Sequence, residues 1–339
     1  MKQTGLLKTA LKRGALLTAA NWPVVLIQFT AESTFKLLLA VPILSGVFLV
    51  TLLLNRNLWD LLNGDLRDIV AGVTSALVAQ PIALVSFLFA FGIVLLGGSA
   101  LMFLVKGGTV WVLADADRSG GPVEHPPLRL AAFRAASRFS IENYMSGSAV
   151  LSRRYLTLGF GLIAVYLISA VAYLLIVFGG YRWITNPTLL VAWTLVAAFL
   201  SILLVVWITV VNLLYLLAQI VIALSGRGVR WSVREVFRFL KAELWDVVGV
   251  FGVILLLVVL ATVASIGATA GLGLIAFAPV ATLIVLPLQL GAWLLRSLVF
   301  QYLGLTTLSA YLHLYHLYEP LAARPADGPR RHHVPAPHS

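Results

Sequence analysis

The stretch that decides the fold runs from Thr188 to Gly226 and reads TLLVAWTLVAAFLSILLVVWITVVNLLYLLAQIVIALSG. It contains no charged residue. About 20 mostly apolar residues are enough for a helix to cross the hydrocarbon core of a bilayer. The stretch therefore predicts a membrane-spanning helix that exceeds the core and must tilt, break or protrude into the cytoplasm.

Four other uncharged stretches predict further spans, at 37–54, 69–105, 156–180 and 247–295. The last is too long for one crossing, and its glycine-rich segment Ser265–Gly273 predicts a tight turn between two helices. Only 11% of the chain is charged, whereas soluble domains carry roughly 25%. The predicted fold is an all-α polytopic transmembrane bundle with six spans, at 37–55, 77–105, 156–178, 190–222, 247–265 and 274–295.

The distribution of Lys and Arg predicts how these spans are oriented. The chain has 24 Lys and Arg and a net charge of +11. With six spans, all but Arg56, Arg67 and Arg182 fall on one side, which the positive-inside rule assigns to the cytoplasm together with both termini. Arg greatly outnumbers Lys, which favours a GC-rich bacterial source and hence an inner membrane. A seventh span at 14–31 would export the basic segment 106–155, so residues 5–30 are expected to lie in the interface.

Three repeats are predicted, at 6–118, 128–226 and 229–318, each a basic amphipathic leader followed by a helical hairpin. In the third leader, Ser232 and Glu235 form a capping-box pattern. Its exposed face is expected to carry Arg234, Arg238 and Lys241 against anionic lipid headgroups. Residues 320–339, rich in Pro, Arg and His, are expected to form a disordered tail.

The sequence offers no parts for catalysis within the membrane. Its 13 acidic residues all fall outside the predicted spans, and it has no cysteine. Charges are kept at bilayer depth only for function, so no catalytic, cofactor-binding or metal-binding residue is predicted. Asn212 and Gln219, two helical turns apart, predict a polar face in the membrane. They could line a permeation path or hydrogen-bond a neighbouring helix.

Two polar clusters near the predicted cytoplasmic surface have competing interpretations. His313, His316 and Glu319 share a helix face and could bind a divalent metal. The favoured alternative is an interfacial helix end, where tyrosines form an aromatic belt at headgroup level, namely Tyr311, Tyr315 and Tyr318. Asp115, Asp117 and Arg118 precede a Gly-Gly-Pro turn. The two carboxylates could form a paired-carboxylate active site, but the favoured interpretation is a solvated helix end.

The chain resembles a group of membrane proteins, and two segments that lead into spans carry the resemblance, Phe139–Tyr144 and Val236–Lys241. The pattern of basic leader, hairpin and long second helix resembles uncharacterised bacterial multi-span proteins. Those are similar to the membrane domain attached to some glycerophosphodiester phosphodiesterases. The resemblance covers roughly residues 6–318 and implies an architecture only, because the catalytic domain of those enzymes is absent from this sequence.

The leading functional hypothesis is therefore a non-enzymatic scaffold, assembly factor or partner subunit of the inner membrane. Its expected partners are anionic lipid headgroups and a membrane protein or a second copy of the chain. Nucleic acid is not expected, because no recognised module accompanies the positive charge. The alternative is a transporter or channel for a lipid-like or neutral solute. A membrane-surface enzyme built on 106–155 is the third hypothesis.

Overall fold

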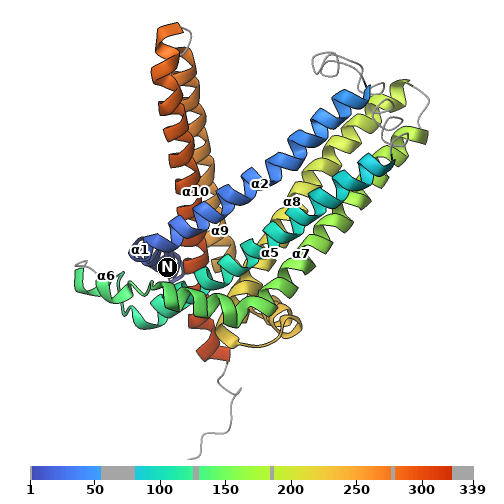
Figure 1. The fold of residues 1–339 in the computed structure, drawn as a ribbon. Coiled ribbons are helices and arrows are strands. Elements are labelled where there is room, and N and C mark those ends of the chain that lie inside the picture. The colour runs from blue at the N-terminus through green and yellow to red at the C-terminus, as the bar shows by residue number, and fades with distance from the viewer. Residues whose placement is uncertain (1, 55–80, 125–129, 184–186, 276–278, 323–339) are drawn as a thin grey trace, which may run out of the picture.

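The computed structural model describes residues 2–54, 81–124, 130–183, 187–275 and 279–322, and within these ranges every regular element is a helix (Figure 1). The helices are α1 (Lys2–Ala20), α2 (Trp22–Leu54), α5 (Pro81–Ser119), α6 (Leu130–Ala136), α7 (Ile141–Trp183), α8 (Pro187–Ser225), α9 (Val229–Ile275) and α10 (Pro279–Ala322).

Local sequence explains where several of these helices begin and end. Helix α8 starts at Pro187, whose ring suits the first helical turn. It ends before Gly226, which adopts a left-handed φ of 62° and donates its N–H to the carbonyl of Ile222 at 3.0 Å. Helix α7 starts after Ser140, whose hydroxyl accepts a hydrogen bond from the N–H of Asn143 at 3.1 Å.

The helices form a base and two arms, which Figure 1 shows diverging from one end of the molecule. The four-helix arm consists of the long apolar parts of α2, α5, α7 and α8, where α2 packs on α5, α5 on α7, and α7 on α8. The two-helix arm is the hairpin of α9 and α10. The base contains α1, α6 and the adjoining ends of α5, α7, α8, α9 and α10.

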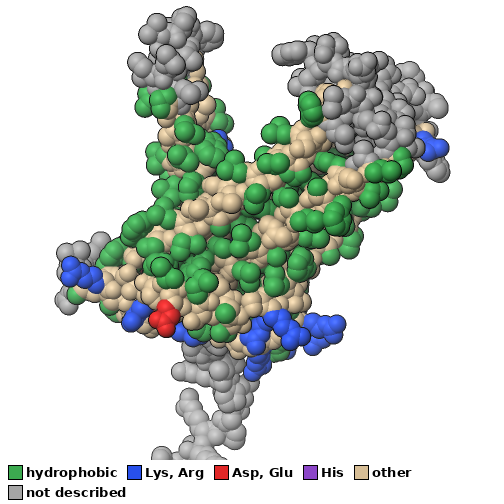
Figure 2. Space-filling model, in the orientation of Figure 1, with side chains coloured by type: hydrophobic (Ala, Val, Ile, Leu, Met, Phe, Trp, Pro, Cys, Tyr) green, Lys and Arg blue, Asp and Glu red, His purple; other side chains and the backbone are tan. Residues whose placement is uncertain are grey.

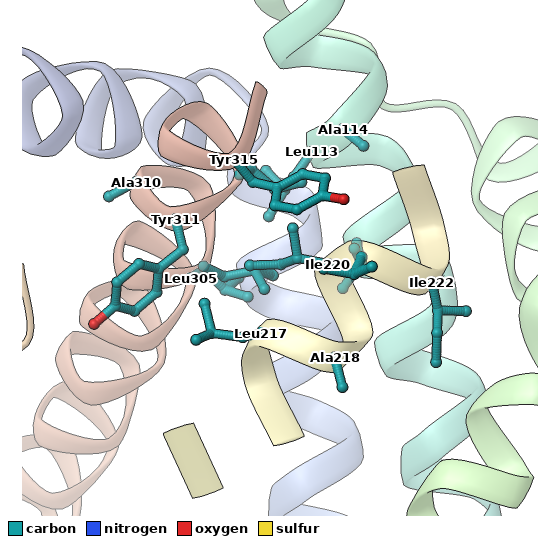
Figure 3. Close-up of a cluster of buried hydrophobic side chains, with 14 of the residues drawn as sticks. Leu113, Ala114, Leu217, Ala218, Ile220, Ile222, Leu305, Ala310, Tyr311 and Tyr315 are labelled. Carbon is teal, nitrogen blue, oxygen red and sulfur yellow. The ribbon is translucent and has the colours of Figure 1, made fainter. Parts of the chain in front are cut away.

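The buried core of the described residues lies in the base. Figure 3 shows apolar side chains from α5, α8 and α10 meeting there, among them Leu113, Leu217 and Tyr311. The arms instead display large apolar side chains on their surfaces, as the green atoms of Figure 2 show. Blue Lys and Arg side chains gather along the lower edge of the base in the same view. This is the surface pattern of a protein whose arms are solvated by lipid.

Five helices of the described chain are long and apolar enough to cross a bilayer, so the chain is a multi-pass membrane protein. Their candidate spans are Trp22–Gly46, Val85–Ser119, Ile141–Arg182, Thr188–Ser225 and Val229–Gly271. Helix α10, which contains most of the sixth predicted span, is not among the five. The count of six spans therefore stays a prediction.

The predicted turn at Ser265–Gly273 is wrong, because α9 continues through this segment to Ile275. Glycine is common in membrane helices, and here its presence did not end one. A Cβ added at Gly267 or Gly271 would meet nothing within 4 Å, so among the described residues no other helix packs closely against these two glycines.

The third leader and its span both belong to helix α9. The helix is kinked between them at Glu243 (φ −122°, ψ 32°). The predicted capping box is wrong, because α9 begins at Val229 and Ser232 already lies inside the helix. The Ser232 hydroxyl donates to the carbonyl of Gly228 at 3.2 Å instead of capping the helix.

The segment expected in the interface packs into the base. Helix α1 ends at Ala20 and lies against α10, while Leu17 and Val24 are fully buried. A Cβ at Gly14 would approach the Thr306 carbonyl oxygen to 2.7 Å, so this glycine is what lets the two helices come so close. Trp22 at the start of α2 is 60% exposed.

Candidate functional site

A buried ion-pair cluster joins three helices of the base. The Nε of Arg13 on α1 donates to Oδ1 of Asp117 on α5 at 2.5 Å, and the two side chains are only 7% and 2% exposed. Other guanidinium hydrogens reach the Glu124 carboxylate at 2.8 Å and the backbone carbonyls of Gly121 and Asp117. Four of the five N–H groups of Arg13 therefore meet an oxygen.

Two imidazoles of α10 complete the cluster. The Nδ1 of His316 lies 2.5 Å from Oδ2 of Asp117, and that of His313 lies 3.4 Å from Oδ1. Arg118 donates to Nε2 of His316 at 3.3 Å. Both carboxylate oxygens of Asp117 therefore face an imidazole nitrogen of α10.

The electrostatics of the cluster favour a structural role. Burial alone would lower the pKa of Arg13, but the hydrogen bonds and negative charges of Asp117 and Glu124 raise it above its ordinary value. The guanidinium thus stays charged. A buried pair of this kind holds together because each partner satisfies the other, and removing one leaves an uncompensated charge.

The sequence-based interpretations of these residues change accordingly. Asp117 does not lie on a solvated helix end, because α5 continues to Ser119 and turns Asp117 inward against α1 and α10. The aromatic belt is wrong for Tyr311 and Tyr315, which are buried; the Tyr311 hydroxyl donates to the Val247 carbonyl at 3.1 Å.

The described residues contain no group of three or more His, Cys, Asp or Glu side chains arranged to hold a metal. His313 and His316 instead turn toward the single carboxylate of Asp117. The side chain of Glu319, the third member of the hypothetical metal set, lies outside the described residues.

Asn21 forms a second connection within the base that sequence reasoning missed. Its amide nitrogen donates to the carbonyls of Leu17 and Ala136, both at 2.9 Å. Its oxygen accepts from the N–H groups of Arg138 and Phe139 at 2.9 and 3.1 Å. One fully buried side chain therefore ties the break between α1 and α2 to the segment between α6 and α7. The only signal in the sequence was an amide inside an otherwise apolar run.

A polar cavity of about 380 Å³, the fork pocket, lies between α2 and α10 where the arms diverge. Its lining residues are Phe29, Glu32, Ser33, Lys36, Trp293, Arg296, Ser297, Phe300 and Gln301. Glu32 pairs with Lys36 at 2.5 Å and accepts a hydrogen bond from the Gln301 amide. Glu32 and Lys36 belong to the candidate span Trp22–Gly46, whereas the sequence analysis put both before the first span.

A second cavity of about 280 Å³, the apolar groove, lies between α9 and α10. It is lined by Ala261, Ala264, Ser265, Ala268, Ala292, Leu295, Arg296, Val299 and Phe300. The fork pocket and the apolar groove share Arg296 and Phe300. The two cavities are therefore adjacent across one edge of α10.

Asn212 and Gln219 lie in different surroundings. Asn212 is exposed and accepts a hydrogen bond from the Tyr166 hydroxyl on the neighbouring α7, while Gln219 is buried in the base. Neither residue lines the fork pocket or the apolar groove. The hydrogen bond between Tyr166 and Asn212 agrees with the second interpretation, in which Asn212 bonds a neighbouring helix.

The basic face predicted on the third leader is exposed. Arg234, Arg238 and Lys241 all lie on the surface of α9, where Arg238 pairs with Glu235 at 3.2 Å. They are available to a bilayer surface, although no lipid contact follows from exposure alone.

Comparison of the chain with known protein families, curated proteins and solved structures gave no match.

Proposed function

We propose that this chain is a non-enzymatic protein of the bacterial inner membrane that acts as a scaffold, an assembly factor or a partner subunit. The main support is the contrast between a base held by buried ion pairs and arms whose apolar faces are exposed. The arms offer a large surface for association within the bilayer.

The buried charged groups of the base are engaged with one another, which favours a structural over a catalytic role. Arg13, Asp117 and His316 satisfy one another within one cluster. A catalytic acid or base needs a path to a substrate, whereas Asp117 is only 2% exposed. The rigid base then sets the direction of the two arms.

Photocrosslinking in intact cells tests the scaffold proposal. A crosslinking amino acid at Leu44 of α2 or Leu288 of α10, both exposed on the arms, should give discrete adducts with another protein or a second copy. The same amino acid at the fully buried Leu113 is the control and should give none. Arm positions that yield no protein adduct would argue against the proposal.

We further propose that the base faces the cytoplasm, as do both termini. Lys and Arg side chains gather along the lower edge of the base in Figure 2, which agrees with the positive-inside rule. Because the chain has no cysteine, single-cysteine variants report cleanly. Arg182→Cys at the far end of α7 should react with a membrane-impermeant maleimide in intact spheroplasts, and Arg234→Cys only after permeabilisation. The reverse pattern would invert the topology.

The second candidate function is a transporter or channel for a lipid-like or neutral solute. The fork pocket favours it, because a polar cavity between two apolar arms resembles a solute path. Proteoliposomes that accelerate transbilayer movement of a fluorescent phospholipid would support this function over the scaffold. The resemblance to the membrane domain of glycerophosphodiester phosphodiesterases stays part of the proposal and assigns no activity.

A further inference from the structure

The fork pocket has an excess of positive charge. Its only described carboxylate, that of Glu32, is already occupied, since one oxygen pairs with Lys36 and the other accepts from Gln301. Lys106 of α5 also interacts electrostatically with Glu32. Two cations, Lys36 and Arg296, line the cavity, and the side chain of Lys36 is 63% exposed.

Arg296 lacks a counter-ion among the residues that the structure describes. Its described close neighbour is the Phe300 ring, 5.6 Å from the guanidinium. On α10 it follows Leu294 and Leu295, which are both exposed and apolar. An arginine in such surroundings is costly in a bilayer unless it reaches an anion. A phosphodiester suits the guanidinium, which can bind two of its oxygens at once.

The apolar groove continues from the same arginine. Small side chains of α9, including Ala264 and Ala268, leave room beside α10, and the groove shares Arg296 and Phe300 with the fork pocket. A soluble anion would use the polar cavity alone. A phospholipid would use both cavities, because its phosphate and its acyl chains are joined.

We propose that the fork pocket and the apolar groove together bind one anionic phospholipid. Its phosphate lies between Arg296 and Lys36, and an acyl chain follows the groove between α9 and α10. The hydroxyls of Ser33 and Ser297, which line the same pocket, suit a glycerol headgroup. This site differs from the exposed face of Arg234, Arg238 and Lys241, and it does not depend on the scaffold proposal.

Native mass spectrometry of the full chain, delipidated in detergent and titrated with phosphatidylglycerol, tests the site. Arg296→Gln should weaken binding of the tightest lipid about fivefold, the effect of one basic residue near a charged headgroup. Arg296→Lys should recover part of the loss, because it restores the charge but not the two-point hydrogen bonding. Arg182→Gln, which removes an exposed arginine at the far end of α7, is the matched control and should leave this affinity unchanged.

A second variant separates a lipid from a free phosphate. Ala268→Leu narrows the groove without changing any charge, so it should weaken phosphatidylglycerol while leaving the pocket cations in position. Glycerol 3-phosphate, which has no acyl chains, should not displace the lipid, and phosphatidylcholine should bind more weakly than phosphatidylglycerol. The proposal is overturned if Arg296→Gln and Arg182→Gln behave alike, if Ala268→Leu has no effect, or if glycerol 3-phosphate competes.

Discussion

The base and the arms are built from similar residues but solvated differently. In the base, apolar side chains such as Leu217 and Ile222 are fully buried, and the charged groups Arg13 and Asp117 are paired within the core. In the arms, apolar side chains such as Leu203 lie on the surface. The base is thus organised like the interior of a soluble protein, while the arms use lipid as their solvent.

This comparison shows where the stability of the molecule resides. Association of membrane helices gains little from moving apolar surface out of lipid, because the lipid is equally apolar. Burial of charge and close packing in the base therefore have larger consequences when they are disturbed. Unfolding in sodium dodecyl sulfate, followed through the fluorescence of the nine tryptophans, can measure these differences.

The largest effect is expected from breaking the ion pair of the base. Arg13→Met leaves Asp117 buried without its main partner, which should cost about 3–5 kcal/mol of unfolding free energy. The double variant Arg13→Met, Asp117→Leu removes both charges and should recover a large part of that loss. A double variant as unstable as the single one would mean that the ion pair is not what connects these helices.

The next largest loss of unfolding free energy is expected at Leu217, which can be compared with Leu203 of the same helix, α8. Leu217→Ala in the base, where the side chain is 1% exposed, should cost about 2–5 kcal/mol through the cavity it leaves. Leu203→Ala on the arm, where the side chain is 54% exposed, should change stability by about 0.5 kcal/mol or less. Equal losses at both positions would show that the arm is packed against something as firmly as the base.

A smaller loss is expected at Asn21. Asn21→Ala leaves the part-buried N–H groups of Arg138 and Phe139 without their acceptor, at a cost of about 1–3 kcal/mol. Asn212→Ala is the matched change in the arm, where about 0.6 kcal/mol is expected for one interhelical hydrogen bond. If Asn212→Ala lowered the unfolding free energy more than Asn21→Ala, polar contacts in the arm would stabilise the protein more than those in the base.

The smallest effect on stability is expected on the surface of the base. Changing Arg234, Arg238 and Lys241 together to Gln should shift the unfolding free energy by about 0.5 kcal/mol or less. The same variant should bind vesicles rich in phosphatidylglycerol more weakly, since each basic residue near the surface adds attraction. Unchanged vesicle binding, compared with the wild-type chain at the same salt concentration, would remove the proposed lipid contact.

Some sequence-based predictions failed for two physical reasons. The glycines of Ser265–Gly273 predicted a turn, yet α9 passes through them, because a run of apolar neighbours in a membrane helix tolerates small residues. Asp117 and Tyr311 looked interfacial because each lies near the end of an apolar stretch. Both are buried because helices distant in the sequence cover them.

The sequence by itself determined that the chain is helical and crosses a membrane, since long uncharged stretches such as Thr188–Gly226 meet a requirement of length and composition that is local. Only the tertiary structure decided which part of α8 faces the core and which faces lipid. Lipid is as apolar as a protein interior, so Leu203 and Leu217 look alike in sequence. It also decided that Arg13 meets Asp117 and His316, because pairings across such separations depend on how the helices pack and leave no periodic pattern in the chain.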